Sequence, residues 1–114
     1  MISKLYLHYL RIARAIDILK KDSHVIDSTA LQLLNEIAVQ HFDGKTLTVS
    51  QALAFNKIAS PATLHRKLDE LREAGLIQQV FEGKDRRTKY LVPTKEADAY
   101  FAKMSKAITS AVND

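Results

Sequence analysis

The sequence predicts a mainly α-helical protein with a small β-hairpin. The chain has 114 residues and an apolar fraction of 46%, which is enough to bury a core without cross-links. Over most of its length, apolar residues recur at steps of three and four, the period of an amphipathic helix. Two short apolar runs between residues 76 and 93 flank a polar stretch with one glycine, as in a hairpin. We expect a single domain over residues 1–114.

The composition excludes several functional classes. The chain has no cysteine, which excludes disulfides and thiolate metal sites. No apolar run approaches the ~20 residues of a membrane span, and no signal-peptide cleavage site follows the first helix-like stretch. The histidines share no metal-ligand spacing, and the sequence holds neither a nucleophile–base pair nor a glycine-rich phosphate loop. We therefore expect a soluble, cytoplasmic, non-enzymatic protein without catalytic residues, metal or other cofactor.

The first helix is expected over residues 1–21. Its apolar residues alternate steps of three and four, the spacing of a coiled-coil interface: Ile2, Leu5, Tyr9, Ile12, Ile16 and Leu19. Two interpretations stay open, since this surface can pack on its own chain or form a dimer interface.

The second and third helices are expected over residues 28–41 and 49–55. Asp27 or Ser28 can cap the second and Thr48 the third, because their side-chain oxygens can accept from free backbone N–H groups. The candidate core residues of these helices are Leu31, Leu34, Ile37, Ala38, Leu53 and Phe55.

The fourth helix is expected over residues 60–74. Ser60 is its N-cap, and Pro61 takes the first helical position, where a missing N–H costs nothing. Gly75 ends the helix, since glycine readily adopts a left-handed backbone. The inward face consists of Leu64, Leu68 and Leu71.

The hairpin consists of strands 76–81 and 88–93, with Gly83 in the turn. A last helix follows over residues 94–112, with Thr94 as cap. Its apolar side includes Tyr100, Phe101, Met104, Ala107, Ile108 and Ala111.

This order describes a winged helix-turn-helix with N- and C-terminal flanking helices, because a short turn joins two helices and a hairpin follows the second. The lobe spans residues 28–93, with a recognition helix at 60–74 and a wing at 76–93.

The outward face of the fourth helix suits a DNA major groove. Arg66 can donate two bonds to guanine, Thr63 can donate or accept, and Ala62 can touch a thymine methyl. The positive helix N-terminus favours phosphate. The candidate DNA-binding residues here are Ser60, Pro61, Ala62, Thr63, His65, Arg66 and Lys67. The alternative is a solvated amphipathic helix, and the acidic residues of its second half limit any contact to the first two turns.

The hairpin tip concentrates positive charge. The net charge is +4, and residues 57–90 hold most of this excess, which favours a polyanionic partner. The basic residues of the tip are Lys84, Arg86, Arg87 and Lys89. An arginine on a narrow β-finger can enter the minor groove, and Asp85 can hold that arginine by a charge-assisted hydrogen bond. A solvated turn with compensating charges is the alternative.

The sequence of this lobe resembles that of the MarR family of bacterial transcriptional regulators. The resemblance covers residues 47–97 and depends on "SPATLHRKLDELREAGLI" together with "DRR" at the wing, followed by a strand and a helix that starts at a threonine. It implies a homodimer on a palindromic DNA site. It also implies base and phosphate contacts by Thr63, His65 and Arg66, with Arg87 in the minor groove steadied by Asp85.

The family builds its dimer from the first and last helices. By this resemblance the dimerisation residues are Leu5, Tyr9, Ile12, Ile16, Leu19, Phe101, Met104 and Ile108. The chain departs from the family pattern in a longer turn, "FNKIAS", in Ala97 where glycine is typical, and in having one helix after the wing instead of two. These departures leave the dimer geometry and the binding of a small-molecule effector open.

Together these features predict a sequence-specific transcriptional regulator that binds double-stranded DNA as a homodimer. The main alternative is a winged-helix protein–protein module without DNA readout, which Asp69, Glu70 and Glu73 favour. An RNA-binding module is a weaker alternative, because no interleaved aromatic platform is present.

Overall fold

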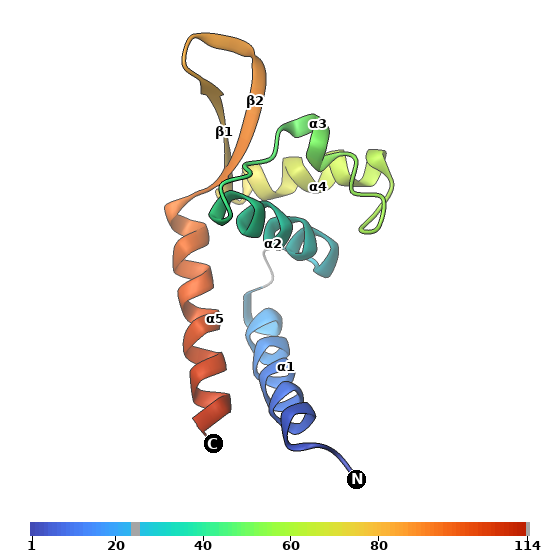
Figure 1. Cartoon of the computed structure of the whole chain (residues 1–114), viewed down its shortest axis with the longest axis vertical. Coiled ribbons are helices and arrows are strands. Elements are labelled where there is room, and N and C mark those ends of the chain that lie inside the picture. Colours follow the sequence, from blue (N-terminus) through green and yellow to red (C-terminus); the bar gives the residue numbers. More distant parts are fainter. Residues whose placement is uncertain (24–25, 114) are drawn as a thin grey trace. The chain divides into compact units, whose positions relative to one another are not determined.

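The computed structural model describes residues 1–23 and 26–113 (Figure 1). The elements follow in the order α1 (Lys4–Ser23), α2 (Ser28–Phe42), α3 (Val49–Ala52), α4 (Pro61–Glu73), β1 (Ile77–Glu82), β2 (Asp85–Pro93) and α5 (Lys95–Asn113). This order confirms a mainly helical protein with one antiparallel hairpin. The single domain expected from the sequence stays a prediction, and within it two compact units can be distinguished. Unit 1 comprises Met1–His24 and Asp98–Asp114, and unit 2 comprises Val25–Ala97.

The N-caps of the lobe helices agree with the sequence expectation. Asp27 rather than Ser28 caps α2, and its Oδ1 accepts from the backbone N of Ala30 at 2.8 Å. Thr48 caps α3, and Ser60 caps α4 directly before Pro61. Each side chain satisfies an N–H group that has no partner within the helix, which defines where the helix begins.

Two element boundaries differ from the sequence expectation. Helix α3 ends at Ala52 instead of Phe55, and the following residues form turns through local backbone hydrogen bonds. Strand β2 begins at Asp85 instead of residue 88, which reduces the turn to Gly83 and Lys84. Gly83 has a φ of 57°, and a tight two-residue hairpin turn needs such a positive angle.

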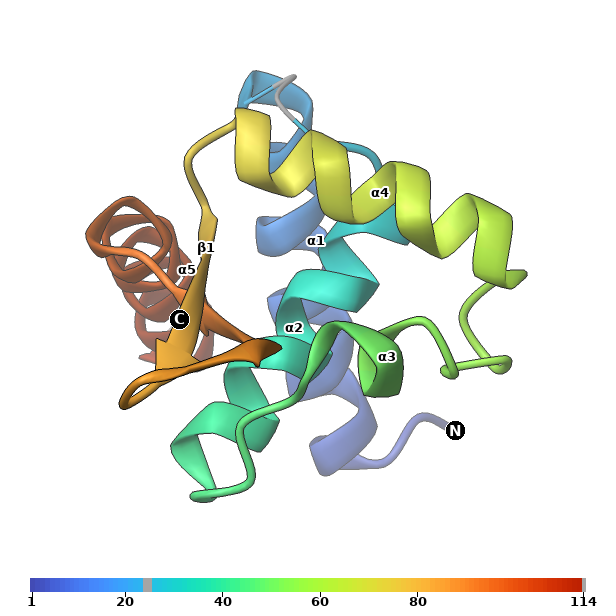
Figure 2. The ribbon, with the colours of Figure 1, turned by 90° about the horizontal axis from the view of Figure 1, so that it is seen from above.

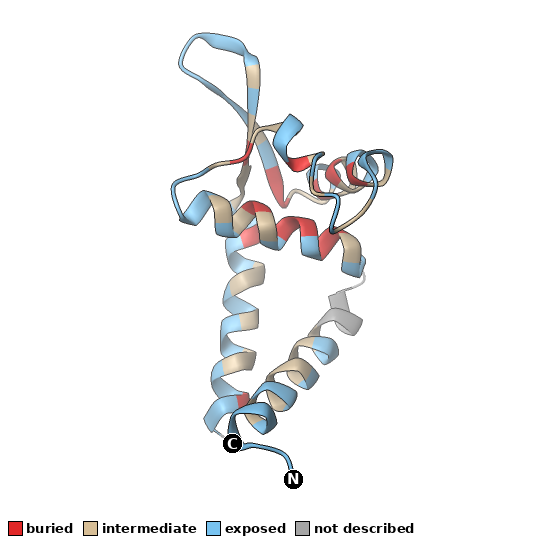
Figure 3. Cartoon of the chain, turned by 45° about the vertical axis from the view of Figure 1, so that its right-hand side comes forward, coloured by how far each residue is buried: buried red, intermediate tan, exposed pale blue. Residues whose placement is uncertain are grey.

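The core of unit 2 lies between α2, α4 and the base of the hairpin (Figures 2 and 3). Its largest fully buried side chains are Leu33, Leu34, Ile37, Leu64, Leu71 and Leu91. The expected inward face of α4 is confirmed, because Leu64, Leu68 and Leu71 are all buried. Ala38, Leu53 and Phe55 are only half-buried. Ala52 and Leu47 are buried in the α3 region.

The wing is joined to the helices at its base. The backbone N of Leu91 donates to the carbonyl of Leu47 at 2.8 Å, and Thr48 forms a bridge with Tyr90. The segment before α3 thus acts as a short third strand against β2. This pairing aligns the base of the hairpin with α3 while the tip extends away from it (Figure 1).

Thr94 links the end of α4 to the start of α5. Its Oγ1 donates to the carbonyl of Gly75 at 2.5 Å and accepts from the backbone N of Ala97 at 3.2 Å. Gly75 follows the C-cap of α4 and has a φ of 76°. One hydroxyl therefore satisfies a carbonyl at one helix end and an N–H at the other.

Replacing Thr94 by valine keeps the side-chain shape and removes both hydrogen bonds. We expect the free energy of unfolding to fall by about 1–2 kcal/mol, because a helix cap is lost and a part-buried carbonyl loses its partner. Urea denaturation followed by circular dichroism measures this change. Thr94→Ser keeps the hydroxyl and should recover most of the loss, whereas equal stability of the valine variant and the native chain would contradict the assignment.

Unit 1 contains α1 and most of α5. Leu5 and Tyr9 are exposed on α1, with 82% of Leu5 accessible. The other proposed dimerisation residues are half-buried, namely Ile12, Ile16, Leu19, Phe101, Met104 and Ile108. No helix among the described residues is long and apolar enough to cross a membrane.

Candidate nucleic-acid interface

The N-terminal end of α4 presents a polar face with small residues. Pro61, Ala62, His65 and Arg66 are exposed, and Thr63 is half-buried. Among the described residues Arg66 forms no ion pair, so its guanidinium is available to a ligand. Small side chains next to a free arginine allow a helix end to approach base edges closely.

Ser60 organises this end of the helix. Its Oγ accepts from the backbone N of Thr63 at 3.3 Å and donates to Thr63 Oγ1 at 3.1 Å. The Thr63 hydroxyl is therefore held near the helix start, where backbone N–H groups carry partial positive charge. This end of α4 has the chemistry to receive a phosphate or a base acceptor.

Two of the three acidic residues of α4, Asp69 and Glu70, form ion pairs within the same helix. Asp69 lies 3.5 Å from His65 Nδ1 and 3.0 Å from Arg72, and Glu70 contacts Lys67 at 3.2 Å. These contacts offset part of the negative charge that would otherwise repel a phosphate backbone. The acidic half of α4 should therefore repel a phosphate backbone less than its number of carboxylates suggests.

The side chain of Lys67 is held by two carboxylates. It is only 12% exposed, and its Nζ contacts Asp27 Oδ2 at 2.5 Å and both carboxylate oxygens of Glu70 at 3.2 Å. A contact of Lys67 with DNA would therefore compete with these two ion pairs, and its expected DNA contact stays a prediction.

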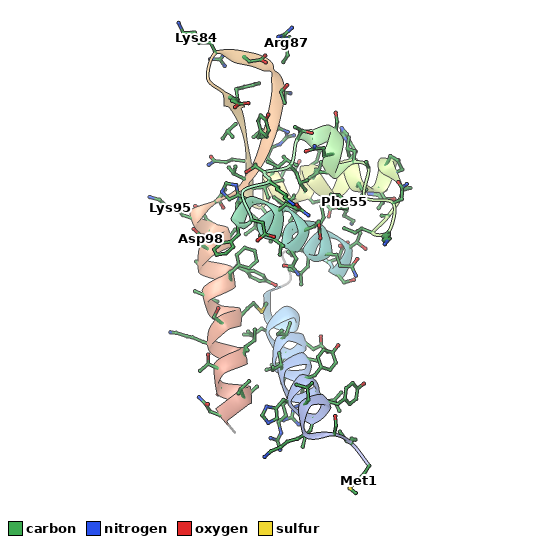
Figure 4. All side chains as sticks on the ribbon, viewed as in Figure 1. Met1, Phe55, Lys84, Arg87, Lys95 and Asp98 are labelled. Atoms are coloured by element: carbon green, nitrogen blue, oxygen red, sulfur yellow. The ribbon has the colours of Figure 1, made fainter. Side chains whose placement is uncertain are left out.

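The wing carries an arginine that is exposed and held in one orientation. The side chain of Arg87 is 92% exposed and lies near the far end of the hairpin, as does Lys84 (Figure 4). Asp85 Oδ1 accepts from the backbone N of Arg87 at 2.9 Å and from its Nε at 3.3 Å. The carboxylate fixes the near end of the guanidinium and leaves the terminal nitrogens without a partner among the described residues.

A β-bulge explains why Arg87 projects from the wing. Phe81 pairs with Lys89 and Glu82 pairs with Asp85, so Arg86, Arg87 and Thr88 have no partner on β1. Extra residues on one strand bend it and redirect its side chains. The alternation of apolar and polar residues in the sequence does not reveal this change in the pairing register of β1 and β2.

The remaining basic side chains of the wing differ in their surroundings. Arg86 stacks over the ring of Phe81 at 5.2 Å from its centroid, a cation–π contact. Lys84 and Lys89 are exposed. Lower on the hairpin, Tyr90 donates to Glu82 at 3.1 Å, and this hydrogen bond to the carboxylate raises the pKa of Tyr90. These contacts restrain the side chains around Arg87.

A groove of about 330 Å³ lies between the start of α3 and strand β2. Its lining residues are Thr48, Val49, Ser50, Arg87, Thr88 and Lys89. Hydroxyls and cations on facing walls form a suitable environment for a phosphate group. Ser50 and Thr88 are not predicted as site residues from the sequence. The hydroxyl residues at the start of α3 are a sequence signal that could have pointed to Ser50, whereas Thr88 lies on β2 and joins the groove through folding.

The structure supports no metal site within its described ranges, where no group of three or more histidine, aspartate and glutamate side chains could hold an ion. His24 lies outside the described residues. His41 Nδ1 lies 2.8 Å from Thr46 Oγ1, which gives this exposed imidazole a local partner.

Helices α2, α3 and α4, followed at once by the hairpin, form a winged helix, and this defines the class of protein. The chain is similar to a solved structure of the disulfide-formed state of the protein AbfR. The TM-score is 0.59 at 18% identity, over 96% of this chain and 70% of that chain. No protein family model and no curated protein matches the sequence. The structural similarity confirms the winged-helix fold.

Proposed function

We propose that this protein is a MarR-like transcriptional regulator that binds double-stranded DNA sequence-specifically in the cytoplasm. It acts as a homodimer on a palindromic site, with α4 in the major groove and the wing in the minor groove. The protein is not an enzyme, and its regulatory effect depends on occupying DNA.

The observation that carries this proposal is the geometry of Arg87. An aspartate that accepts from the backbone N–H two residues on is common in turns, but here the same oxygen also accepts from Arg87 Nε at 3.3 Å, which orients the guanidinium. A minor-groove contact benefits from it, because an arginine held in an extended orientation loses less conformational entropy on binding. The minor groove also carries the enhanced negative potential that attracts a guanidinium.

Contacts by α4 supply the base readout in this proposal. Arg66 binds guanine, Thr63 and His65 bind base edges or phosphates, and Ala62 packs on a thymine methyl. Ser60 and Pro61 bring the helix start close to the backbone. Lys84, Arg86 and Lys89 add phosphate attraction, which weakens as salt concentration rises.

Dimer formation uses the apolar surface of unit 1. Exposed apolar side chains gather on α1, namely Leu5, Tyr6, Leu7, Tyr9, Leu10 and Ile18. Surface of this kind is rarely left uncovered in a monomer. A second copy that covers it would give a two-fold symmetric protein, and such symmetry matches a palindromic site.

The deciding experiment is selection of bound duplexes from a random pool, with the molecular mass of the protein measured alongside. We expect a palindromic motif with half-sites about one helical turn apart and the mass of a dimer. Duplex binding that falls steeply with salt supports direct contact with DNA phosphates. Absence of any enriched duplex would favour the protein–protein module instead.

Replacing Arg87 by alanine is expected to weaken binding of the selected duplex by about 10- to 150-fold, since a charge-assisted contact contributes about 1.5–3 kcal/mol. Asp85→Ala should cause part of the same loss, and the double variant should bind no worse than Arg87→Ala. Fluorescence anisotropy with labelled duplex measures these affinities. Lys95→Ala is the control, because Lys95 is an exposed lysine outside the proposed interface (Figure 4). Additive losses from Asp85 and Arg87 would show that the two side chains act separately.

A further inference from the structure

One carboxylate joins the start of α2 to the middle of α4. Asp27 Oδ1 caps α2 by accepting from the backbone N of Ala30 at 2.8 Å, while Oδ2 accepts from Lys67 Nζ at 2.5 Å. Glu70, one turn further along α4, contacts the same ammonium with both oxygens at 3.2 Å. Asp27 and Lys67 lie 40 residues apart in sequence, so this contact exists only in the folded lobe.

We propose that Lys67 is a positioning residue that fixes the orientation of α4 for DNA reading and does not itself touch DNA. This inference rests on the proposed function of α4 as the recognition helix. Asp27 is its partner across the two helices, and Glu70 holds the ammonium from the other side.

The position of Lys67 along the helix makes this restraint effective. Successive residues of an α-helix are separated by about 100° of rotation and about 1.5 Å of rise. Lys67 directly follows Arg66, so fixing the direction of Lys67 also fixes the direction in which Arg66 leaves the helix. Bidentate recognition of guanine depends on that direction, whereas general attraction to phosphate does not.

The buried leucines of α4 do not by themselves fix the rotation of the helix. Leu64, Leu68 and Leu71 hold the helix against the core, and non-directional apolar contacts specify rotation and sliding less sharply than a charged hydrogen bond does. Two carboxylates hold the Lys67 ammonium at once, since Asp27 contacts it from the start of α2 and Glu70 from one turn further along α4.

The charges of this pair persist at neutral pH. The hydrogen bond from Lys67 lowers the pKa of Asp27 below its usual value. The hydrogen bonds to Asp27 and then to Glu70 raise the pKa of Lys67. Both groups are therefore ionised under the conditions in which DNA would be bound.

The test compares binding of the selected duplex with binding of a scrambled duplex in full-length variants. Lys67→Met keeps the aliphatic stem and removes the charge. Asp27→Ser keeps an N-cap for α2 and is too short to reach Lys67. We expect each variant to bind the selected duplex about 10-fold more weakly, with scrambled-duplex affinity and salt dependence unchanged and with no further loss in the double variant.

Two further variants separate positioning from general stability and from charge. Lys67→Arg keeps a cation that reaches Asp27 and should restore specific binding. Arg72→Met removes a cation of α4 that is half exposed and, among the residues that the structure describes, pairs with Asp69, and it should leave the ratio of the two affinities unchanged. Thermal melts confirm that all variants are folded at the assay temperature, so loss of fold cannot imitate loss of positioning.

Two outcomes would contradict the positioning role of Lys67 or the proposed function. If Lys67→Met reduces the salt dependence by about one released counterion while Asp27→Ser binds normally, then Lys67 contacts phosphate and the inference is wrong. If the native protein binds no duplex, the proposed function fails, and amide hydrogen exchange then tests the restraint separately. Faster exchange along α4 in both single variants, without additivity, would support the restraint, whereas unchanged exchange would overturn it.

Discussion

Leu64→Ala is expected to lower the free energy of unfolding by about 2–5 kcal/mol, because it leaves a cavity in a closely packed core. Leu64 is fully buried in α4, on the face that packs against α2. A loss of this size is a large part of the stability of a small protein. Chemical denaturation at one fixed protein concentration measures the change.

Phe42→Ala provides the matched comparison for this prediction. It removes more carbon atoms than Leu64→Ala, but Phe42 is 91% exposed at the end of α2. We expect a change within about 0.5 kcal/mol, as for most surface substitutions. Similar losses for both variants would mean that burial does not distinguish these two positions.

Arg66→Ala is expected to weaken binding of the selected duplex by about 1–3 kcal/mol and to relax the preference for one base of each half-site. The physical reason is the loss of two parallel hydrogen bonds to guanine. Arg66 is exposed on the first two turns of α4 and forms no ion pair within the described residues, so its removal leaves no buried partner unsatisfied. A repeated selection with the variant reveals the relaxed position.

Arg66→Lys distinguishes base readout from attraction to phosphate. Lysine keeps the positive charge but lacks the planar fork that matches guanine. A base contact predicts that Arg66→Lys loses specificity nearly as Arg66→Ala does. If the lysine variant instead binds the selected duplex like the native protein, Arg66 acts through its charge and the base assignment fails.

Some features of the wing can be predicted from the sequence, and others cannot. Gly83 and the flanking apolar runs are sufficient to predict a hairpin, and Asp85 beside two arginines suggests an aimed side chain. The bulge that leaves Arg86, Arg87 and Thr88 without partners on β1 is a property of strand pairing. Pairing depends on which residues of two strands meet, and the polar stretch between them carries no alternation that sets a register.

The surroundings of Lys67 could not be predicted from the sequence. A lysine next to an arginine that is expected to read bases suggests a phosphate contact. Asp27, which contacts the Lys67 ammonium, lies 40 residues earlier in the sequence. No local pattern connects the two residues, so only the packing of α2 against α4 brings them together.

The sequence by itself determined the element order, the caps at Thr48, Ser60 and Thr94, and the leucine face of α4, while it left the cap of α2 open between Asp27 and Ser28. These features depend on interactions within a few residues of the chain, where side-chain chemistry and helical period are sufficient. Only the tertiary structure decided the bulge at Arg87, the pairing of Lys67 with Asp27 and the division into two units. Each of these depends on contacts between distant segments, whose geometry is set by the packing of the whole lobe and not by local preference.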